Sequence, residues 1–214
     1  HDARLGPGAG ERAGQSCGHA GRVEDDIHLA RRIERLGKTD AEMRSQRGAL
    51  RVDIDERPGI VDTKTRIGDW EGDTIEGVKG SGYLATMVDR RSKYLVLAWS
   101  NTKQSVEIRK AITRSFRRHG ALPCETITLD NGREFADHVR LKEKLGADVY
   151  FAKPYHSWER GLNENTNGLL RQHFPKGMDF GKITQYRLTK IEAELNDRPR
   201  KSLDYRTPRE IISQ

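Results

Sequence analysis

Three carboxylates of this chain have the chemistry and the placement of metal ligands. Asp73 lies in "DWEGDTIEG", Asp130 follows a strand-like run in "TLDNGREF", and Glu164 lies in "ERGLNENTNGLLRQ". Like charges that are brought together repel each other, and proteins tolerate such clusters where divalent cations neutralise them. Carboxylate oxygens are hard ligands that suit Mg²⁺ or Mn²⁺. We therefore expect Asp73, Asp130 and Glu164 to converge on a metal site if the fold makes their segments neighbours.

Each carboxylate also has a purely structural interpretation. Because "DNG" is a common turn sequence, Asp130 could shape a hairpin, although the residues after it look helical. Asp73 could be a solvent-facing strand residue, and Glu164 could form ion pairs with arginines on a solvated helix face. The order of the three residues, and their placement on two strand-like segments and one helix, favours the metal site.

The helix expected around Glu164 is unusually rich in amides. Asn163, Asn165 and Asn167 compete for backbone hydrogen bonds and so cost helix stability, which indicates a role other than helix formation. The core-facing stripe consists of Leu162, Thr166, Leu169, Leu170 and His173. The polar stripe on the opposite side consists of Arg160, Glu164, Asn167 and Arg171. The Glu164 carboxylate would thus lie between two arginines and beside one amide.

Alternating elements should position these residues. Turns separate three strands of a predicted antiparallel meander at residues 69–77, 82–89 and 93–100. Beyond it we expect a helix, a strand, a helix and a strand at residues 104–120, 124–130, 137–146 and 147–152. The Glu164 helix follows, and a last helix at residues 183–199 stops at Pro199. This order predicts an α/β fold: a mixed sheet of the three-strand meander plus two further strands, with helices on both faces.

The first 50 residues differ in composition from the rest of the chain. Residues 1–50 are rich in Gly, Ala and Arg, and their one short helical candidate, residues 24–36, is too little to form a core. The chain also begins with His rather than Met, which suggests a fragment or a truncated reading frame. We expect residues 1–50 to be a disordered or degenerate leader and residues 51–214 to be the catalytic core.

Composition points to a basic intracellular protein with a polyanionic partner. The 214 residues include 39 Lys and Arg against 32 Asp and Glu, a formal charge of +7, and 34% are hydrophobic, which is enough for one core. The two cysteines, Cys17 and Cys124, have no metal-type spacing, and we expect free thiols in a reducing cytoplasm. The sequence has no apolar stretch long enough to span a membrane and no signal-peptide pattern, so we expect a soluble protein.

The residues around the three carboxylates resemble a known family. Asp73, Asp130 and Glu164, with 33 residues between the last two, look like the catalytic triad of DDE transposases and retroviral-type integrases. The stretches "WEGD", "ERGLNENTNGLLRQ" and "LNDRPRKSLDYRTPREI" resemble bacterial transposases of the insertion-sequence-30 type, and the similarity covers roughly residues 50–213. The resemblance implies a ribonuclease H-like fold, which agrees with the element order above.

The resemblance implies phosphoryl transfer on DNA. Two Mg²⁺ or Mn²⁺ ions held by Asp73, Asp130 and Glu164 would activate the water that cleaves a DNA 3′ end, and then the freed 3′-hydroxyl that attacks target DNA. The implied partners are transposon ends, target DNA and further copies of the chain, in the cytoplasm of a bacterium in association with its nucleoid. Family members normally carry a helix-turn-helix region before the core, and residues 1–50 do not look like one.

Contacts with DNA are expected on two helices. Beside the third carboxylate, the amides of Asn163 and Asn167 can bond to DNA without adding negative charge. Arg160 and Arg171 would contact the DNA backbone, and pairing with neighbouring glutamates is the alternative for both. On the helix of residues 104–120, a phosphate track is expected from Lys110, Arg114 and Arg117. Basic residues late in a helix also complement its dipole, which explains this track equally well.

Two other functions remain open at this stage. A hydrolytic nuclease of the same fold would cleave DNA with a metal ion but would not join DNA ends. A catalytically silent remnant that only binds DNA is suggested by the start of the chain and by the missing front region. The strings outside the triad favour the transposase over both alternatives.

Overall fold

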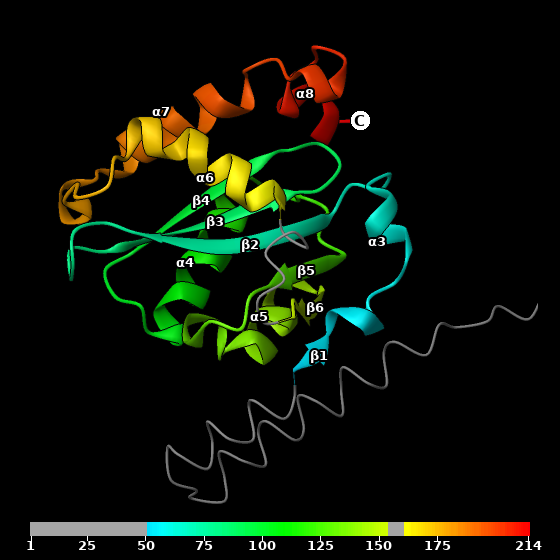
Figure 1. The fold of residues 1–214 in the computed structure, drawn as a ribbon, viewed down its shortest axis with the longest axis horizontal. Coiled ribbons are helices and arrows are strands. Elements are labelled where there is room, and N and C mark those ends of the chain that lie inside the picture. The colour runs from blue at the N-terminus through cyan, green and yellow to red at the C-terminus, as the bar shows by residue number, and fades with distance from the viewer. Residues whose placement is uncertain (1–50, 154–160) are drawn as a thin grey trace, which may run out of the picture.

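A six-stranded mixed sheet organises the part of the chain that this computed structural model describes, residues 51–153 and 161–214 (Figure 1). Its strands lie in the order β1, β6, β5, β2, β3, β4. Their bounds are β1 Val52–Asp53, β2 Asp69–Glu76, β3 Tyr83–Asp89, β4 Leu95–Ser100, β5 Thr126–Leu129 and β6 Asp148–Phe151. The expected leader, residues 1–50, and its short helix lie outside the described residues.

The antiparallel half of the sheet is the predicted meander. β2 pairs with β3 and β3 with β4, both antiparallel, whereas β5 pairs in parallel with β2 and β6. The prediction of five strands is wrong in one respect, because β1 adds a sixth by pairing with β6 at Val52 and Tyr150. A strand of two residues has no periodicity of its own, so only its partner strand reveals it.

Helices cover both faces of the sheet, as the sequence predicted (Figure 1). One face carries α4 (Ser105–Arg118) and α5 (His138–Leu145), and the other carries α6 (Gly161–His173) and α7 (Gln185–Asn196). Two short helices, α3 (Ile60–Thr63) and α8 (Pro208–Ile212), lie at the periphery (Figure 1). Among the described residues, no helix combines the length and the apolar character that crossing a lipid bilayer requires.

Strand β2 separates two hydrophobic cores, because alternate side chains point to opposite faces of a sheet. Trp70 faces α4 and packs edge-on against Phe116, with ring centroids 4.9 Å apart. Ile75 faces the opposite core, which includes Leu170 of α6. Asp73 shares the parity of Ile75, so it points to the side of the sheet that α6 covers.

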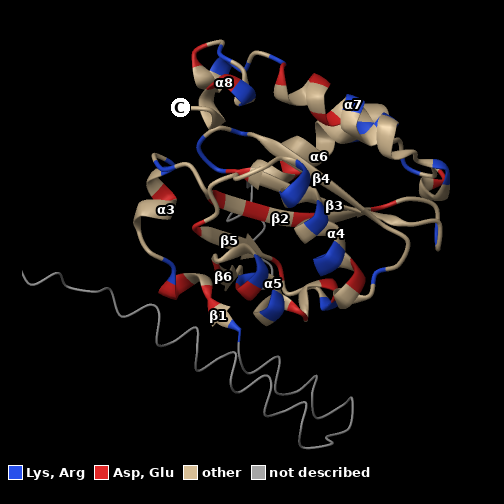
Figure 2. Cartoon of the chain, turned by 180° about the vertical axis from the view of Figure 1, so that it is seen from behind, with Lys and Arg blue, Asp and Glu red and all other residues tan. Residues whose placement is uncertain are grey.

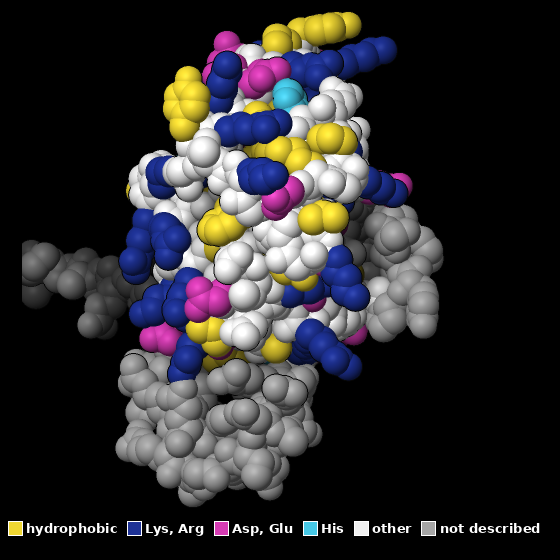
Figure 3. Space-filling model, turned by 90° about the vertical axis from the view of Figure 1, so that its left-hand side faces the viewer, with side chains coloured by type: hydrophobic (Ala, Val, Ile, Leu, Met, Phe, Trp, Pro, Cys, Tyr) yellow, Lys and Arg dark blue, Asp and Glu magenta, His cyan; other side chains and the backbone are white. Residues whose placement is uncertain are grey.

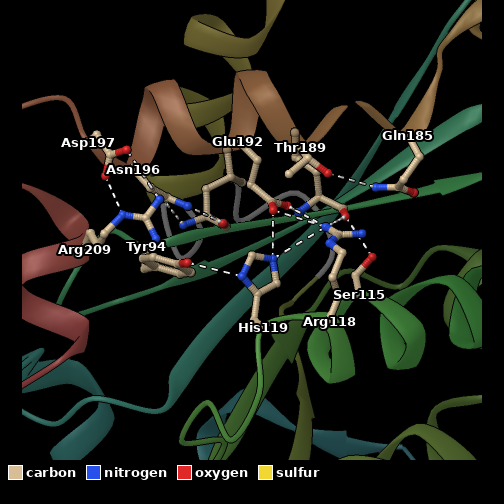
Figure 4. A network of polar contacts seen from close by, with 12 residues as sticks. Tyr94, Ser115, Arg118, His119, Gln185, Thr189, Glu192, Asn196, Asp197 and Arg209 are labelled. Atoms are coloured by element: carbon tan, nitrogen blue, oxygen red, sulfur yellow. Dashed lines mark hydrogen bonds and ion pairs between the residues drawn. The ribbon is translucent and has the colours of Figure 1, made fainter. Parts of the chain in front are cut away.

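The outer edge of the sheet, strand β4, is covered by side chains of α7 (Figure 4). Asn196 accepts the N–H of Leu95 and donates to the carbonyl of Leu95, both at 2.8 Å. Glu192 accepts the N–H of Leu97 and also pairs with Arg118 at 3.1 Å. Because an uncovered edge strand offers its amides to any passing strand, α7 takes the place of a further strand at this edge.

Candidate active site

Asp73 and Asp130 come from neighbouring parallel strands. The register pairs Glu71 of β2 with Thr128 of β5. Two residues further along both strands, Asp73 therefore comes beside Asp130, the first residue after β5. Gly72 leaves room for the Leu129 side chain of β5, because a Cβ at Gly72 would collide with it. Two of the three predicted carboxylates are thus adjacent in the fold.

Asp130 also organises the turn in which it lies. Its Oδ1 accepts the N–H of Gly132 at 2.9 Å, so the turn expected from "DNG" does form. The chain then enters a 3-10 helix, Arg133–Phe135, and α5, rather than returning as a paired strand. The hairpin alternative for Asp130 is therefore wrong. Asp130 stabilises its own turn and also lies at the end of β5.

Asn167 of α6 fixes the carboxylate of Asp73. The Asn167 side-chain N–H donates to Asp73 Oδ2 at 2.8 Å, and Asp73 Oδ1 accepts the backbone N–H of Thr74 at 2.8 Å. On β3, the Thr86 hydroxyl donates to the oxygen of the Asn167 amide at 3.4 Å. Hydrogen bonds to a charged group are stronger than those between neutral groups. The contact holds α6 across β2 and sets the direction of the Asp73 carboxylate.

Glu164 lies on the same stripe of α6, one turn before Asn167. Its side chain is exposed, so it can change rotamer without disturbing the core. Within residues 51–153 and 161–214, no three Asp, Glu, His or Cys side chains gather closely enough to hold a metal ion. The donor chemistry of Asp73 and Asp130 nevertheless fits Mg²⁺ or Mn²⁺, because both offer carboxylate oxygens from adjacent strands. A third ligand from Glu164 requires its side chain to turn toward Asp73.

The chain is similar to one protein family and to several curated proteins. Residues 64–157 match the family described as "Integrase core domain". The chain is 48% identical over 164 residues to the transposase for insertion sequence element IS4351 of Bacteroides fragilis. It is 40% identical over 178 residues to transposase InsI for insertion sequence element IS30A of Escherichia coli (strain K12). These alignments cover 77% and 80% of this chain but 50% and 45% of the two transposases, so the chain spans about half the length of these curated relatives.

Two solved structures share the fold of this chain. The catalytic core domain of BIV integrase matches with a TM-score of 0.52 at 18% identity, over 69% of this chain and 95% of that one. A simian T-cell lymphotropic virus intasome in complex with PP2A regulatory subunit B56 gamma matches with a TM-score of 0.56 at 21% identity, over 68% of this chain and 54% of that one. The sheet and its helices therefore have the ribonuclease H-like fold of retroviral integrase cores, as the sequence predicted.

The structure corrects the DNA contact expected for Asn163. Its side chain is 1% exposed, and neither of its polar atoms has a hydrogen-bond partner among the described residues. Asn163, Thr166 and Leu170 are all buried at the spacing of one helix face, so Asn163 extends the inner stripe of α6 toward its beginning. A side chain in this position cannot reach DNA without rotation of α6.

The other side chains expected to contact DNA from α6 differ in their surroundings. Arg160 lies outside the described residues. Arg171 donates to the backbone carbonyl of Glu76 at 3.2 and 3.3 Å, so its guanidinium ties α6 to the end of β2. The contact with DNA expected for Arg171 stays a prediction, as does that of Asn167, whose amide is engaged by the contacts described above.

The basic residues of α4 lie on the face of the sheet opposite to Asp73. Figure 2 shows Lys and Arg along α4, where the side chains of Lys110, Arg114 and Arg117 are exposed. Lys110 pairs with Glu107 at 2.8 Å. The phosphate track therefore stays a prediction for a surface that is separate from the carboxylates.

Glu134 is a buried carboxylate near the site that the sequence did not single out. Its Oε1 accepts the hydroxyl of Thr74 at 2.8 Å and pairs with the ammonium of Lys103 at 3.2 Å. Gly132 lies between Glu134 and Asp130, since a Cβ at Gly132 would collide with both carboxylates. The only signal in the sequence was the closeness of Glu134 to Asp130 along the chain, which does not reveal burial.

Glu71 and Arg90 form a buried ion pair on the Asp73 face of the sheet, with 2.7 Å between Glu71 Oε1 and Arg90 Nη1. Burial raises the pKa of the Glu71 carboxyl, while Arg90 and the backbone N–H of Asn163 act in the opposite direction. Removing one partner would leave a buried charge without compensation, which costs about 3–5 kcal/mol. The pair therefore fixes the beginning of β2 beside the candidate site. In the sequence, the alternation of acidic residues in "DWEGD" indicated that Glu71 lies on the same side of the strand as Asp73.

Proposed function

We propose that this chain is the catalytic part of a transposase that cleaves the 3′ ends of a DNA element and joins them to target DNA. The observation that supports this most is the placement of Asp73 beside Asp130, with Asn167 of the Glu164 helix bonded to Asp73. The relatives named as transposases of insertion sequence elements support the same reaction. Because the chain spans about half of those relatives, the activity of the whole protein belongs to the proposal.

The proposed reaction consists of two successive phosphoryl transfers. Water attacks the phosphorus of a phosphodiester in line, the bond between phosphorus and O3′ breaks, and the departing oxygen takes up a proton to become a 3′-hydroxyl. That hydroxyl then attacks a phosphodiester of the target DNA. A new bond between phosphorus and O3′ forms, and a 3′-hydroxyl of the target strand is released.

Each residue of the site has a proposed role. Asp73, Asp130 and Glu164 would hold two Mg²⁺ or Mn²⁺ ions, which when bound supply activation of the attacking oxygen and neutralisation of charge on the leaving oxygen. Asn167 would keep the Asp73 carboxylate in one direction through their 2.8 Å hydrogen bond. The bond from Gly132 to Asp130 would do the same for the second carboxylate.

DNA and further copies of this chain are the proposed partners. The formal charge of +7 favours a polyanion. On the face shown in Figure 3, Lys and Arg side chains are spread out, with acidic side chains among them. Such a distribution supports affinity that comes from many phosphate contacts and depends steeply on salt. Assembly of several copies on paired transposon ends, in the cytoplasm of a bacterium on its nucleoid, is part of the same proposal.

The test of this function is the joining of a pre-cut DNA end to a plasmid. The purified chain is incubated with Mg²⁺ or Mn²⁺, a labelled duplex that carries a free 3′-hydroxyl, and supercoiled plasmid. We expect label to become covalently attached to the plasmid, and to disappear when the metal ion is chelated. Metal-dependent nicking without joining would identify a hydrolytic nuclease instead. Binding of DNA without either reaction would identify a remnant that only binds DNA.

A further inference from the structure

A charged pocket of about 730 Å³ lies on the Asp73 face of the sheet, beside the beginning of β2. Its walls come from α3, from the turn between β3 and β4, and from the first turn of α6, and Figure 1 shows α3 beside this end of β2. The lining includes Glu71, two residues before Asp73, and Asn165, the residue after Glu164. The pocket therefore adjoins the candidate active site but is formed by other side chains.

Two arginines form the buried floor of the pocket. Arg57 and Arg90 are 9% and 4% exposed. Arg57 donates to the Thr128 hydroxyl at 2.8 Å, and both arginines contact the Asp62 carboxylate. The Nε of Arg57 is buried without a hydrogen-bond partner among the described residues. Burial first, and then the neighbouring Arg90, lowers the pKa of Arg57. Arg90 is also paired with Glu71 at 2.7 Å, so Glu71 and Asp62 compensate the two arginines. The positive charge that the pocket can offer to an anion therefore comes mainly from the two lysines that also line it.

Two lysines form the rim of the pocket, and both have a left-handed backbone. Lys64 has a φ of 54° and Lys93 a φ of 62°. Lys64 is the C-cap of α3, and Lys93 lies in the connection between β3 and β4, so the backbone at both residues is accounted for by a helix end and a turn. Burial, followed by the charge of Lys64, lowers the pKa of the Lys93 ammonium. The two ammonium groups therefore repel each other across the pocket, and an anion between them would relieve that repulsion.

We propose that this pocket binds one backbone phosphate of the DNA strand on which the candidate site acts, with Lys64 and Lys93 as the contacting residues over a floor of Arg57 and Arg90. This inference rests on the proposed function. Two residues along a strand correspond to about 7 Å, which is about the distance between neighbouring phosphates on one DNA strand. A phosphate held in the pocket would thus place a phosphodiester a short distance along the strand near Asp73.

The test combines a protein variant with an altered DNA backbone. Lys64→Gln and Lys93→Gln are introduced together, and the matched control carries Lys144→Gln and Lys190→Gln, two exposed lysines outside the pocket. The affinity for a labelled duplex is measured by fluorescence anisotropy at several salt concentrations with the metal ion chelated. We expect the pocket variant to bind all sequences more weakly and to lower the slope of log affinity against log salt by about 1. The control should keep the slope of the parent, and both variants should melt like the parent.

The position of the phosphate is found with duplexes in which one phosphate at a time is an uncharged methylphosphonate. For the parent chain, one substitution near the reactive 3′ end should weaken binding, and the pocket variant should no longer respond to that substitution. Equal responses of parent and variant at every phosphate would overturn the proposal. So would tight binding of a mononucleotide or inorganic phosphate that the variant loses while its affinity for duplex DNA stays unchanged.

These measurements separate the inference from the proposed function. Binding is measured without a metal ion, so it does not depend on cleavage or joining. If the chain joins DNA ends but the pocket variant responds like the parent, the pocket proposal fails and the function stands. If the coupling between pocket and phosphate is found in a chain that neither cleaves nor joins, the proposed function fails and the phosphate site stands.

Discussion

The two faces of β2 differ in what they contribute. On the α4 side, Trp70 is fully buried and Gly72 leaves room for the Leu129 side chain of β5. On the α6 side, Glu71 pairs with Arg90, and Asp73 is held by Asn167. One strand of eight residues can do both because its side chains alternate. Substitutions of adjacent residues fall on opposite faces of β2 and should therefore change different properties. Substitutions two residues apart fall on the same face and should change the same property.

The largest effect is expected from Trp70→Ala, on the apolar face. Loss of a fully buried Trp side chain lowers the free energy of unfolding by about 3–5 kcal/mol, which urea denaturation would measure. Well below the melting temperature, the variant that remains folded should join DNA at a rate close to that of the parent. A folded Trp70→Ala chain that cannot join DNA would show that the two faces are not separable.

The next effect is expected from the charged face. Asp73→Asn, Asp130→Asn and Glu164→Gln each keep the shape of the side chain but remove one charge from the proposed metal cluster. Each should lower cleavage and joining by at least about a hundredfold, since metal stabilisation of the transition state is worth several kcal/mol. DNA binding without a metal ion should be retained or become tighter, because a negative charge near phosphate has gone.

The control for these variants is Glu143→Gln, an exposed carboxylate on α5. It should react like the parent in the joining assay. If the two aspartate variants are inactive while Glu164→Gln joins DNA normally, the third ligand is not Glu164.

A smaller effect is expected from Asn167→Ala. This change removes a hydrogen bond to the Asp73 carboxylate, and bonds to charged groups contribute about 1.5–3 kcal/mol. We expect joining to fall by about tenfold or somewhat more, with little change in DNA affinity. Gln172→Ala, an exposed amide on the same helix, is the matched control. A loss of DNA affinity that equals the loss of rate would assign Asn167 to DNA contact rather than to orientation of Asp73.

The smallest effect is expected from Arg114→Gln combined with Arg117→Gln on α4. Both side chains are exposed on the face opposite to Asp73, and charges further apart than the Debye length of about 10 Å are largely screened. Joining should change by less than about twofold at physiological salt. A large loss of DNA affinity would instead support the phosphate track that the sequence predicted there.

The sequence predicted the elements better than it predicted their contacts. The meander was predictable because its strands alternate between two faces and are separated by turn residues. The burial of Ile108 and Ile112 on α4 was predictable from helical spacing. Strand β1 was not, because two residues become a strand only through their pairing with β6. The local sequence pattern thus predicts the meander and α4, whereas β1 depends on its partner strand β6.

The elements that carry Asp73, Asp130 and Glu164 were predictable from the sequence, whereas the metal site of these three carboxylates stays a prediction. The bond between Asn167 and Asp73 depends on the angle at which α6 crosses β2, and sequence spacing does not contain that angle. The same crossing turns Asn163 inward, which its amide character did not suggest. The backbone bonds of Arg171 to Glu76 also depend on this crossing.

The covering of β4 by α7 restricts how copies of this chain can associate. With the amide and carbonyl of Leu95 bonded to Asn196, and the amide of Leu97 bonded to Glu192, this edge has no vacant positions there for a foreign backbone. A continuous sheet shared between copies cannot start at these residues. Any multimer that uses this side of the molecule must meet through side chains, so its geometry can be changed by point substitutions, and the protein is protected there against open-ended polymerisation.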